Sequence, residues 1–217
     1  MDNKVFVVGI CGSTCSGKTT FANEIVEGFK MKAPEGKRIA IIGQDSFYIG
    51  LLEGEDPRIK NYDIPEAIDW NFLLGVVNSL INRKSVQIPI YDFKTHSRQA
   101  ETTTIEPVDI VIIEGILIFN CEELLPMLDL KVFINASSDL CLARRILRDT
   151  RERGRDVEGI IDQYLAHVKP SNDDLVIPSQ KRADIVVNNH IIPNSIPVAK
   201  ILPGFELVMN NIISRAQ

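Results

Sequence analysis

The chain alternates between short apolar runs and longer stretches in which apolar residues recur every three or four positions. The first apolar run, 5–10, leads into a glycine-rich segment, after which Phe21, Ile25 and Phe29 follow helical spacing. Short continuous apolar runs are typical of parallel strands that are buried on both faces. The pattern predicts a strand at 5–10 and a helix over 19–30.

The same alternation continues along the rest of the chain. Further strands are predicted at 38–43, 86–91, 99–105, 107–113, 130–135 and 183–187, and further helices at 65–84, 138–151, 156–168 and 205–215. Pro89 places its strand at a sheet edge, because proline cannot donate a ladder hydrogen bond. Asp63 and Pro65 are expected at the start of their helix, Gly154 interrupts the helical run, and Pro170 follows its end. The pattern predicts an α/β fold of one domain, 1–217, with a parallel sheet and helices on both faces.

Residues 12–19 read Gly-Ser-Thr-Cys-Ser-Gly-Lys-Thr, which fits the phosphate-binding pattern G-x-x-x-x-G-K-[ST]. The glycines let the backbone wrap around a phosphate, and the amide groups between them point inward. A chance Gly/Ser-rich turn is the alternative, but the strand before it and the helix after it are the context that the motif needs. We expect a nucleoside triphosphate to bind here, to Gly12, Ser13, Thr14, Cys15, Ser16, Gly17, Lys18, Thr19 and Thr20.

Composition limits the class of protein but does not indicate a reaction. The 217 residues are 45% hydrophobic, with no apolar stretch of the length, about 18 residues, that a membrane span needs. No basic and apolar leader precedes the first strand, and the four cysteines lack disulfide-like spacing, so we expect a cytoplasmic protein with reduced thiols. The net charge of −5 argues against a nucleic-acid partner.

The charge is unevenly distributed. Residues 141–155 hold six arginines against Asp149 and Glu152, which gives 6 − 2 = +4 and leaves −5 − 4 = −9 for the rest of the chain. An arginine-rich segment in an acidic protein fits a small, highly charged anion. The alternative is a solvated helix face with ion pairs such as Arg145–Asp149.

Two carboxylates follow predicted strands, at the edge where ligands bind in open α/β sheets. Asp45 follows the strand at 38–43 and is the candidate base for a substrate hydroxyl, whereas Glu114 follows the strand at 107–113 and suits Mg²⁺. The alternative is a structural role, in which each carboxylate only caps the next turn. The expected metal ligands are Thr19, Glu114 and Asp45. The three histidines are scattered, so no metal cluster or covalent triad is predicted.

Several segments together resemble the uridine kinase (uridine–cytidine kinase) family of P-loop kinases: 12–19, 44–48, 61–67, 89–98, 114–118 and 144–156. The resemblance implies ATP, or GTP, and Mg²⁺ as cofactors, and phosphorylation of uridine and cytidine at the 5′-hydroxyl. It also implies a β-hairpin at 84–105 that binds the nucleoside and an arginine-rich helical lid at about 144–170. A homo-oligomer, a tetramer, is a further implication.

The resemblance also implies roles for single residues. Asp45 matches the catalytic base and Asp63 the carboxylate that holds the ribose 2′ and 3′ hydroxyls, while Lys18 and Arg148 stabilise the transferring phosphate. The remaining nucleoside contacts are Tyr48, Tyr91, Phe93, His96, Arg145, Arg155 and Gln163, and Arg148 and Arg153 join the ATP site. From the residues alone, the alternative for the segment at 91–98 is a hydrophobic hairpin with a stray histidine.

The chain departs from the family pattern in places. Ile64 stands where histidine is common and Tyr62 replaces phenylalanine, while the stretch from His190, with Pro193, Pro197 and Pro203, differs altogether. Three other functions stay open. They are a related kinase acting on nicotinamide riboside, pantothenate or ribulose phosphate, a non-catalytic nucleotide-dependent regulator, and a catalytically silent subunit.

Overall fold

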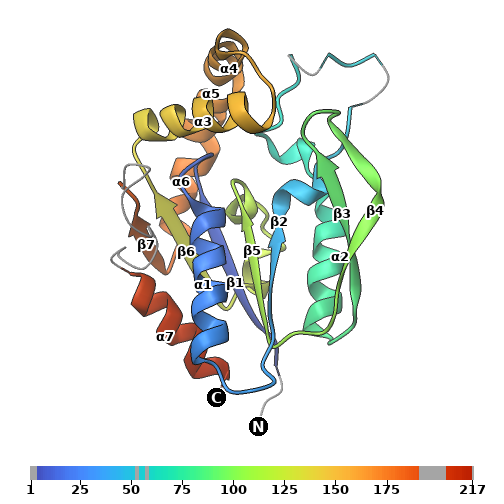
Figure 1. Ribbon diagram of the computed structural model, residues 1–217, viewed down its shortest axis with the longest axis vertical. Helices are drawn as coiled ribbons and strands as arrows, with labels where there is room; N and C mark the ends of the chain where they lie inside the picture. The colour runs from blue at the N-terminus through green and yellow to red at the C-terminus, as the bar shows by residue number, and fades with distance from the viewer. Residues whose placement is uncertain (1–3, 52–53, 57–58, 191–203, 217) are drawn as a thin grey trace.

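The computed structural model describes residues 4–51, 54–56, 59–190 and 204–216, and its centre is a parallel sheet (Figure 1). Five strands pair in the order β2–β5–β1–β6–β7, every pair parallel. They are β1 (Phe6–Gly12), β2 (Ile39–Gly43), β5 (Ile110–Gly115), β6 (Leu130–Asn135) and β7 (Ile185–Asn188). The predicted α/β fold with a parallel sheet is thereby confirmed.

Helices bury both faces of the sheet. The face covered by α1 (Lys18–Lys32) and α7 (Phe205–Ala216) lies opposite the face covered by α2 (Trp70–Ile81). Side chains along β1 alternate between the two, since Val8 and Ile10 pack with α1 and α7 while Val7 and Cys11 pack in the cluster that contains α2. A strand apolar at every position is what a sheet buried on both sides requires. Because helices cover both faces of the sheet, a ligand can approach it at the carboxyl ends of the strands.

The predicted hairpin forms a separate two-stranded antiparallel sheet, β3 (Val86–Asp92) and β4 (Ser97–Ile105), beside the β2 edge of the central sheet (Figure 1). Its register shifts between Pro89 and Tyr91, where the proline lacks an N–H for the ladder. The turn carries His96 in the left-handed region, at φ 53°. In Figure 1 the tip of the hairpin points toward the carboxyl ends of the sheet strands.

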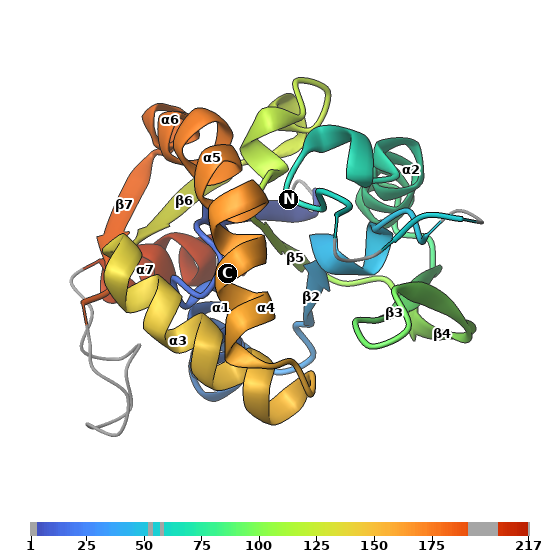
Figure 2. The ribbon, with the colours of Figure 1, turned by 90° about the horizontal axis from the view of Figure 1, so that it is seen from above.

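The arginine-rich segment lies across the carboxyl ends of the strands, as the view from above shows (Figure 2). It consists of α3 (Ser138–Glu152) and α4 (Val157–Gln163), with Gly154 at φ 67° in the turn between them. Glycine adopts this left-handed conformation without steric penalty. The predicted interruption of the helical run at Gly154 is confirmed.

The helix predicted to end before Pro170 continues to Arg182, so that boundary was wrong. The chain stays helical through Pro170 and Pro178. A proline clashes with the carbonyl four residues earlier, and a π-helical turn precedes each proline and relieves that clash by widening the helix. In order the segments are Tyr164–Val168 (π), α5 (Lys169–Ser171), Asn172–Val176 (π), α6 (Ile177–Ser179) and Gln180–Arg182 (3₁₀).

The start of α2 also differs from the prediction. Asp69, not Asp63, caps this helix by accepting from the Phe72 amide at 3.1 Å, and Pro65 begins a separate 3₁₀ turn, Pro65–Ala67. Asp63 is thereby free of a capping role. The other 3₁₀ turns are Gln44–Phe47, Ile118–Asn120 and Leu125–Met127.

Two further expectations concern the chain as a whole. No helix in the described part of the chain is long and apolar enough to cross a membrane. The divergent stretch that begins at His190 lies largely outside the described residues, which resume at Gly204.

Candidate active site

A single cavity of about 400 Å³ brings the predicted site residues together at the carboxyl edge of the sheet. Nearly all of them line it: Thr14, Cys15, Gly17, Lys18, Thr19, Thr20, Asp45, Tyr48, Asp63, Tyr91, Phe93, His96, Glu114, Arg145, Arg148, Arg153, Arg155 and Gln163. Gly12, Ser13 and Ser16 also belong to the loop, but they are buried and do not line the cavity. Residues from the loop, from the hairpin and from the segment of α3 and α4 therefore surround one space.

The loop at 12–19 has the backbone of an anion site. Cys15 and Gly17 adopt left-handed conformations, with φ 57° and 101°, which turn successive amides toward the same side. Gly12, at φ 150°, has no room for a side chain, because a Cβ would lie 2.4 Å from the carbonyl oxygen of Ile134. Lys18 is buried, and its Nζ donates to the Ser13 carbonyl at 3.0 Å. The loop offers a ring of N–H donors with an ammonium group beside it.

Two residues that the sequence did not indicate hold this loop. Asn189, directly after β7, donates from Nδ2 to the Ser16 carbonyl at 2.7 Å, and Arg144 donates to the Cys15 carbonyl at 3.3 Å. A Cβ on Gly17 would lie 2.3 Å from Asn189 Nδ2. Asn189 is far from the loop in sequence and belongs to no motif, so only the neighbouring position of β7 and the loop could reveal it.

Oxygen donors lie next to the loop. Thr19 Oγ1 donates to Glu114 Oε1 at 2.8 Å. Burial raises the pKa of Glu114; Lys18 opposes the shift and the nearby Asp45 reinforces it. A hydroxyl and carboxylates are ligands that Mg²⁺ accepts, although no three acidic, histidine or cysteine side chains in the described residues form a complete metal cage. This donor set fits an ion held partly by phosphate oxygens and water.

Asp45 and Asp63 face the cavity from neighbouring segments. Asp45 lies on the 3₁₀ turn after β2, where the buried Gln44 fixes the backbone by accepting from the Leu117 amide at 2.9 Å. Asp63 is held by its own amide, which donates to Asn61 Oδ1 at 2.9 Å. Burial raises the pKa of Asp63, and Arg145 opposes the shift. The two carboxylates are acceptors for hydroxyl groups of a ligand.

Aromatic rings form the side of the cavity next to the hairpin. Tyr62 stacks on His96, with ring centroids 5.1 Å apart and an interplanar angle of 23°, and Tyr91 contacts both Tyr48 and Phe93 at 5.3 Å. Within the described part of the chain, the hydroxyls of Tyr62 and Tyr91 are buried without a hydrogen-bond partner. Buried polar groups of this kind are normally satisfied, so a ligand with polar edges fits here.

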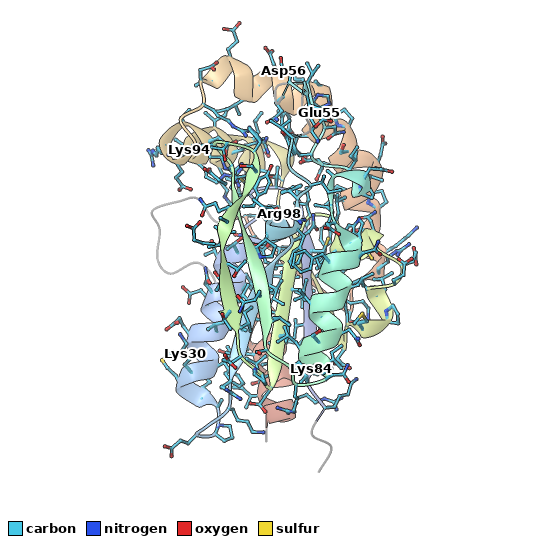
Figure 3. All side chains as sticks on the ribbon, turned by 90° about the vertical axis from the view of Figure 1, so that its right-hand side faces the viewer. Lys30, Glu55, Asp56, Lys84, Lys94 and Arg98 are labelled. Atoms are coloured by element: carbon cyan, nitrogen blue, oxygen red, sulfur yellow. The ribbon has the colours of Figure 1, made fainter. Side chains whose placement is uncertain are left out.

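Arg98 ties the hairpin to the segment that carries Asp45. Its guanidinium donates to the carbonyls of Phe47 and Tyr48, at 3.0 and 3.1 Å, and to Asp69 Oδ2 at 3.3 Å. Figure 3 shows Arg98 on the hairpin side of the molecule. Although Arg98 lies in the segment 89–98 that carries the family resemblance, sequence alone did not predict this anchoring role. The signal was an arginine at the end of a run otherwise assigned to ligand binding.

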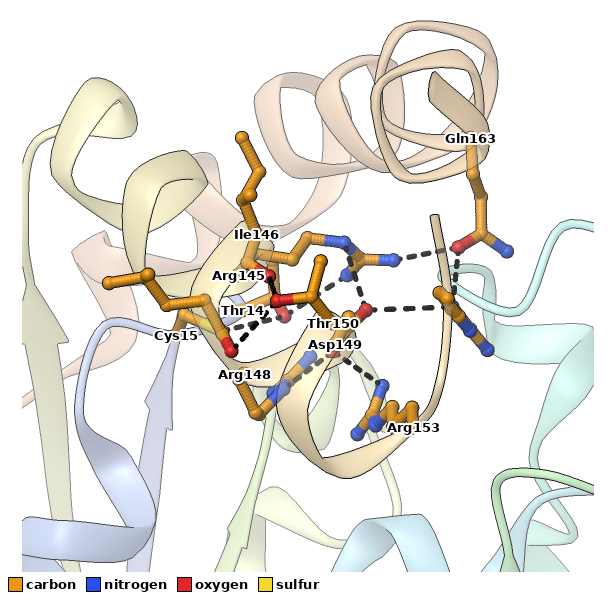
Figure 4. Close-up of polar contacts among 11 residues, drawn as sticks. Thr14, Cys15, Arg145, Ile146, Arg148, Asp149, Thr150, Arg153 and Gln163 are labelled. Atoms are coloured by element: carbon orange, nitrogen blue, oxygen red, sulfur yellow. Dashed lines mark hydrogen bonds and ion pairs between the residues drawn. The ribbon is translucent and has the colours of Figure 1, made fainter. Parts of the chain in front are cut away.

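The segment of α3 and α4, which we label the lid, contributes four arginines, Arg145, Arg148, Arg153 and Arg155, which we call the arginine clamp. Figure 4 shows guanidinium groups of the clamp arranged around Asp149. Gln163 Oε1 accepts from Arg145 at 2.8 Å and from Arg155 at 2.9 Å, so this predicted base contact binds two clamp members. The guanidinium carbon of Arg153 lies 3.9 Å from the centroid of the Phe93 ring, and this cation–π contact joins the lid to the hairpin.

Named relatives share most of this chain. It is 42% identical over 184 residues to uridine-cytidine kinase B of Dictyostelium discoideum, covering 84% of this chain and 74% of that protein. It is 43% identical to a uridine kinase of Clostridium novyi (strain NT), covering 83% and 86%. A chloroplastic uridine/cytidine kinase of Arabidopsis thaliana is 40% identical, and the match covers 86% of this chain and only 39% of that longer protein.

The fold and the family model agree with these relatives. The solved structure of phosphoribulokinase from Rhodobacter spheroides superposes with a TM-score of 0.65, at 18% identity, over 91% of this chain and 75% of that one, which shows a shared fold. The model of the phosphoribulokinase/uridine kinase family matches residues 7–193. This chain therefore belongs to the phosphoribulokinase/uridine kinase family.

Proposed function

We propose that this protein transfers the γ-phosphate of ATP to the 5′-hydroxyl of uridine and cytidine. The observation that carries the proposal is the single cavity, in which the phosphate-binding loop faces Asp45, Asp63 and the aromatic side chains of the hairpin. A phosphate donor and a nucleoside acceptor need such neighbouring sites. The named relatives at 40–43% identity support the same substrates.

On the donor side, the loop at 12–19 and Lys18 bind the triphosphate. Thr19 and Glu114, with Asp45 nearby, would hold the Mg²⁺ that accompanies ATP, and the ion would neutralise charge on the phosphates. The order of these elements, strand then loop then helix, supports binding of the phosphates at the N-terminus of α1, where unpaired amides favour an anion.

On the acceptor side, Asp63 accepts from the ribose hydroxyls and the aromatic cluster holds the base. The base lies among Tyr48, Tyr91 and Phe93, and His96 and the unpartnered tyrosine hydroxyls meet its polar edge. Asp45 lies between the two halves and accepts the proton of the 5′-hydroxyl as its oxygen bonds to the γ-phosphorus and the bond from that phosphorus to ADP breaks. The arginine clamp stabilises the negative charge on the transferring group.

A substrate panel tests this proposal directly. γ-Labelled ATP is offered with uridine, cytidine, adenosine, nicotinamide riboside, pantothenate and ribulose 5-phosphate, and both ADP and labelled product are measured. We expect the highest kcat/KM with uridine or cytidine and almost no ADP without an acceptor. A higher value with another acceptor would assign the protein to a different kinase activity, and acceptor-independent behaviour would support a regulator. Replacing ATP with GTP in the same panel decides the donor.

His96 predicts a specific pH dependence. Burial lowers its pKa below the ordinary value near 6.5, and Arg155 and Arg153 lower it further, so the ring stays neutral above that pH. A neutral ring can both donate to and accept from a base edge, whereas the protonated ring only donates. We expect the KM for uridine to stay level from about pH 8 to 6.5 and to rise only below. His96→Gln should remove the histidine-dependent part of that rise; an unchanged profile would contradict the role.

The resemblance to uridine kinases also leads us to propose a homotetramer. Light scattering on the eluting protein measures its mass against the 24.3 kDa of one chain.

A further inference from the structure

Asp149 is the residue around which the lid arginines gather, although it does not line the cavity. Its side chain is 0% exposed, and it lies within 4 Å of a guanidinium nitrogen of every clamp member. The distances are 3.7 Å to Arg145, 2.8 Å to Arg148, 3.4 Å to Arg153 and 3.6 Å to Arg155. The buried Asp149 carboxylate therefore contacts four arginines that line the cavity, without lining the cavity itself.

An ordinary helix ion pair does not explain this arrangement. Helix spacing accounts for Arg145 and Arg153, four residues to either side of Asp149, but not for Arg148 or Arg155. The turn at Gly154 brings Arg155 back, and the amides of Arg153 and Arg155 both donate to the Asp149 carbonyl, at 3.2 and 3.1 Å. The backbone and the carboxylate of one residue thus organise both sides of the turn.

The charges in this cluster do not balance. Four guanidinium groups against one carboxylate leave +3, and like charges held this closely repel one another. Burial opposes ionisation of Asp149, but Arg153 and Arg148 outweigh it and hold its pKa below the ordinary range, so the carboxylate stays charged. On the cavity side the cluster meets Asp45 and Asp63, and further negative charge would be stabilised there.

The arginines keep hydrogen-bond donors for a ligand. Arg148 donates to Asp149 through Nε, and its guanidinium makes no other hydrogen bond among the described residues, while it lines the cavity. A guanidinium has five N–H donors, so both terminal nitrogens of Arg148 remain for phosphate oxygens. Asp149 thereby fixes one edge of this group and leaves the other edge to the ligand.

We propose that Asp149 is a positioning residue that assembles the arginine clamp before the phosphates bind. Its carboxylate holds the guanidinium groups in the geometry that the transferring phosphoryl group needs, and it acts only through them. The inference rests on the proposed kinase activity. It gives Asp149 a role in the site, whereas the alternative from the sequence was a solvated helix face with an Arg145–Asp149 ion pair.

Asp149→Asn keeps the shape of the side chain and removes its charge. The N–H groups of the new amide then face the N–H groups of the arginines, and two donors cannot form a hydrogen bond. We expect kcat to fall about 100-fold, the size of effect seen when a preorganised charge-stabilising donor is lost. ATP should bind no more weakly than to the wild type, because the cluster becomes more positive by one charge. A site that had merely collapsed would lose ATP affinity and kcat together, so this split distinguishes positioning from structural damage.

The measurements are kcat with uridine, or with whichever acceptor the panel identifies, and ATP affinity and stoichiometry by calorimetry. The matched control is Asp139→Asn, the same chemical change on an exposed residue at the start of α3, which should retain wild-type kcat. Wild-type kcat in Asp149→Asn, or a parallel loss of ATP affinity, would overturn the proposal. Failure of the wild type with every acceptor would instead overturn the proposed function.

If Asp149→Asn does not fold, Asp149→Glu keeps the charge and moves the carboxylate by one methylene. A displacement of about 1 Å near a reacting centre can lower a rate on the order of 100-fold, so kcat should fall at least about tenfold with full ATP stoichiometry. Wild-type kcat in this variant would show that the position of the carboxylate does not matter.

Discussion

Asp45→Asn is expected to lower kcat for uridine about 1,000-fold or more, while the affinity for ATP changes by less than about threefold. The amide keeps the size of the side chain but cannot accept a proton from the 5′-hydroxyl. Asp45 lies on the 3₁₀ turn beyond β2, away from the loop amides that bind phosphate, so ATP keeps its main contacts. Initial rates with saturating uridine, and calorimetry with ATP, measure the two quantities.

A matched control separates the loss of this carboxylate from the loss of any negative charge nearby. Glu66→Gln removes an exposed carboxylate from the 3₁₀ turn Pro65–Ala67, which does not line the cavity, and should retain wild-type kcat. Near-normal uridine phosphorylation by Asp45→Asn would remove Asp45 as the base.

Asp63→Ala is expected to lower kcat/KM for uridine about 100- to 1,000-fold and to have a much smaller effect with 2′-deoxyuridine. A site built to hydrogen-bond a substrate hydroxyl discriminates strongly against analogues that lack it, because its buried polar group is left unpaired. Asp63 is such a group, since it is partly buried at the wall of the cavity, where desolvation is the first cause of its raised pKa. The variant should therefore lose most of the preference for the ribonucleoside.

The experiment compares kcat/KM for both nucleosides in the wild type, Asp63→Ala and the control Glu66→Gln. An equal loss on both nucleosides would mean that Asp63 does not recognise the 2′-hydroxyl. It would instead indicate a general effect on the shape of the pocket around Asn61 and Asp63.

The sheet was predictable because its strands are buried on both faces. Runs such as 107–113 are apolar at nearly every position, and few other elements allow that. Helix boundaries were less predictable, since they depend on backbone detail. A proline ends most helices, so Pro170 predicted a helix end. Only the π-helical turn before it shows how this helix continues.

The candidate site divides in the same way. The loop at 12–19 and Glu114 near the carboxyl end of β5 are local signals, because sequence neighbours form the phosphate-binding loop and the strand end. Asn189 and Arg98 carry no such signal. Each acts on a backbone carbonyl far away in the sequence, of Ser16 or of Phe47, and a single sequence does not record which segments meet.

The order of residues along the chain already shows that a phosphate-binding loop motif joins a buried strand to a helix and that arginines concentrate between residues 141 and 155. Those features follow from local pattern and charge. Folding determines which charged side chains are buried, which are paired and which line the cavity. It buried Asp149 behind the arginine clamp, freed Asp63 from a helix cap and brought the hairpin against the lid through Arg153 and Phe93. The reason is that burial and pairing depend on segments that only the folded chain brings together.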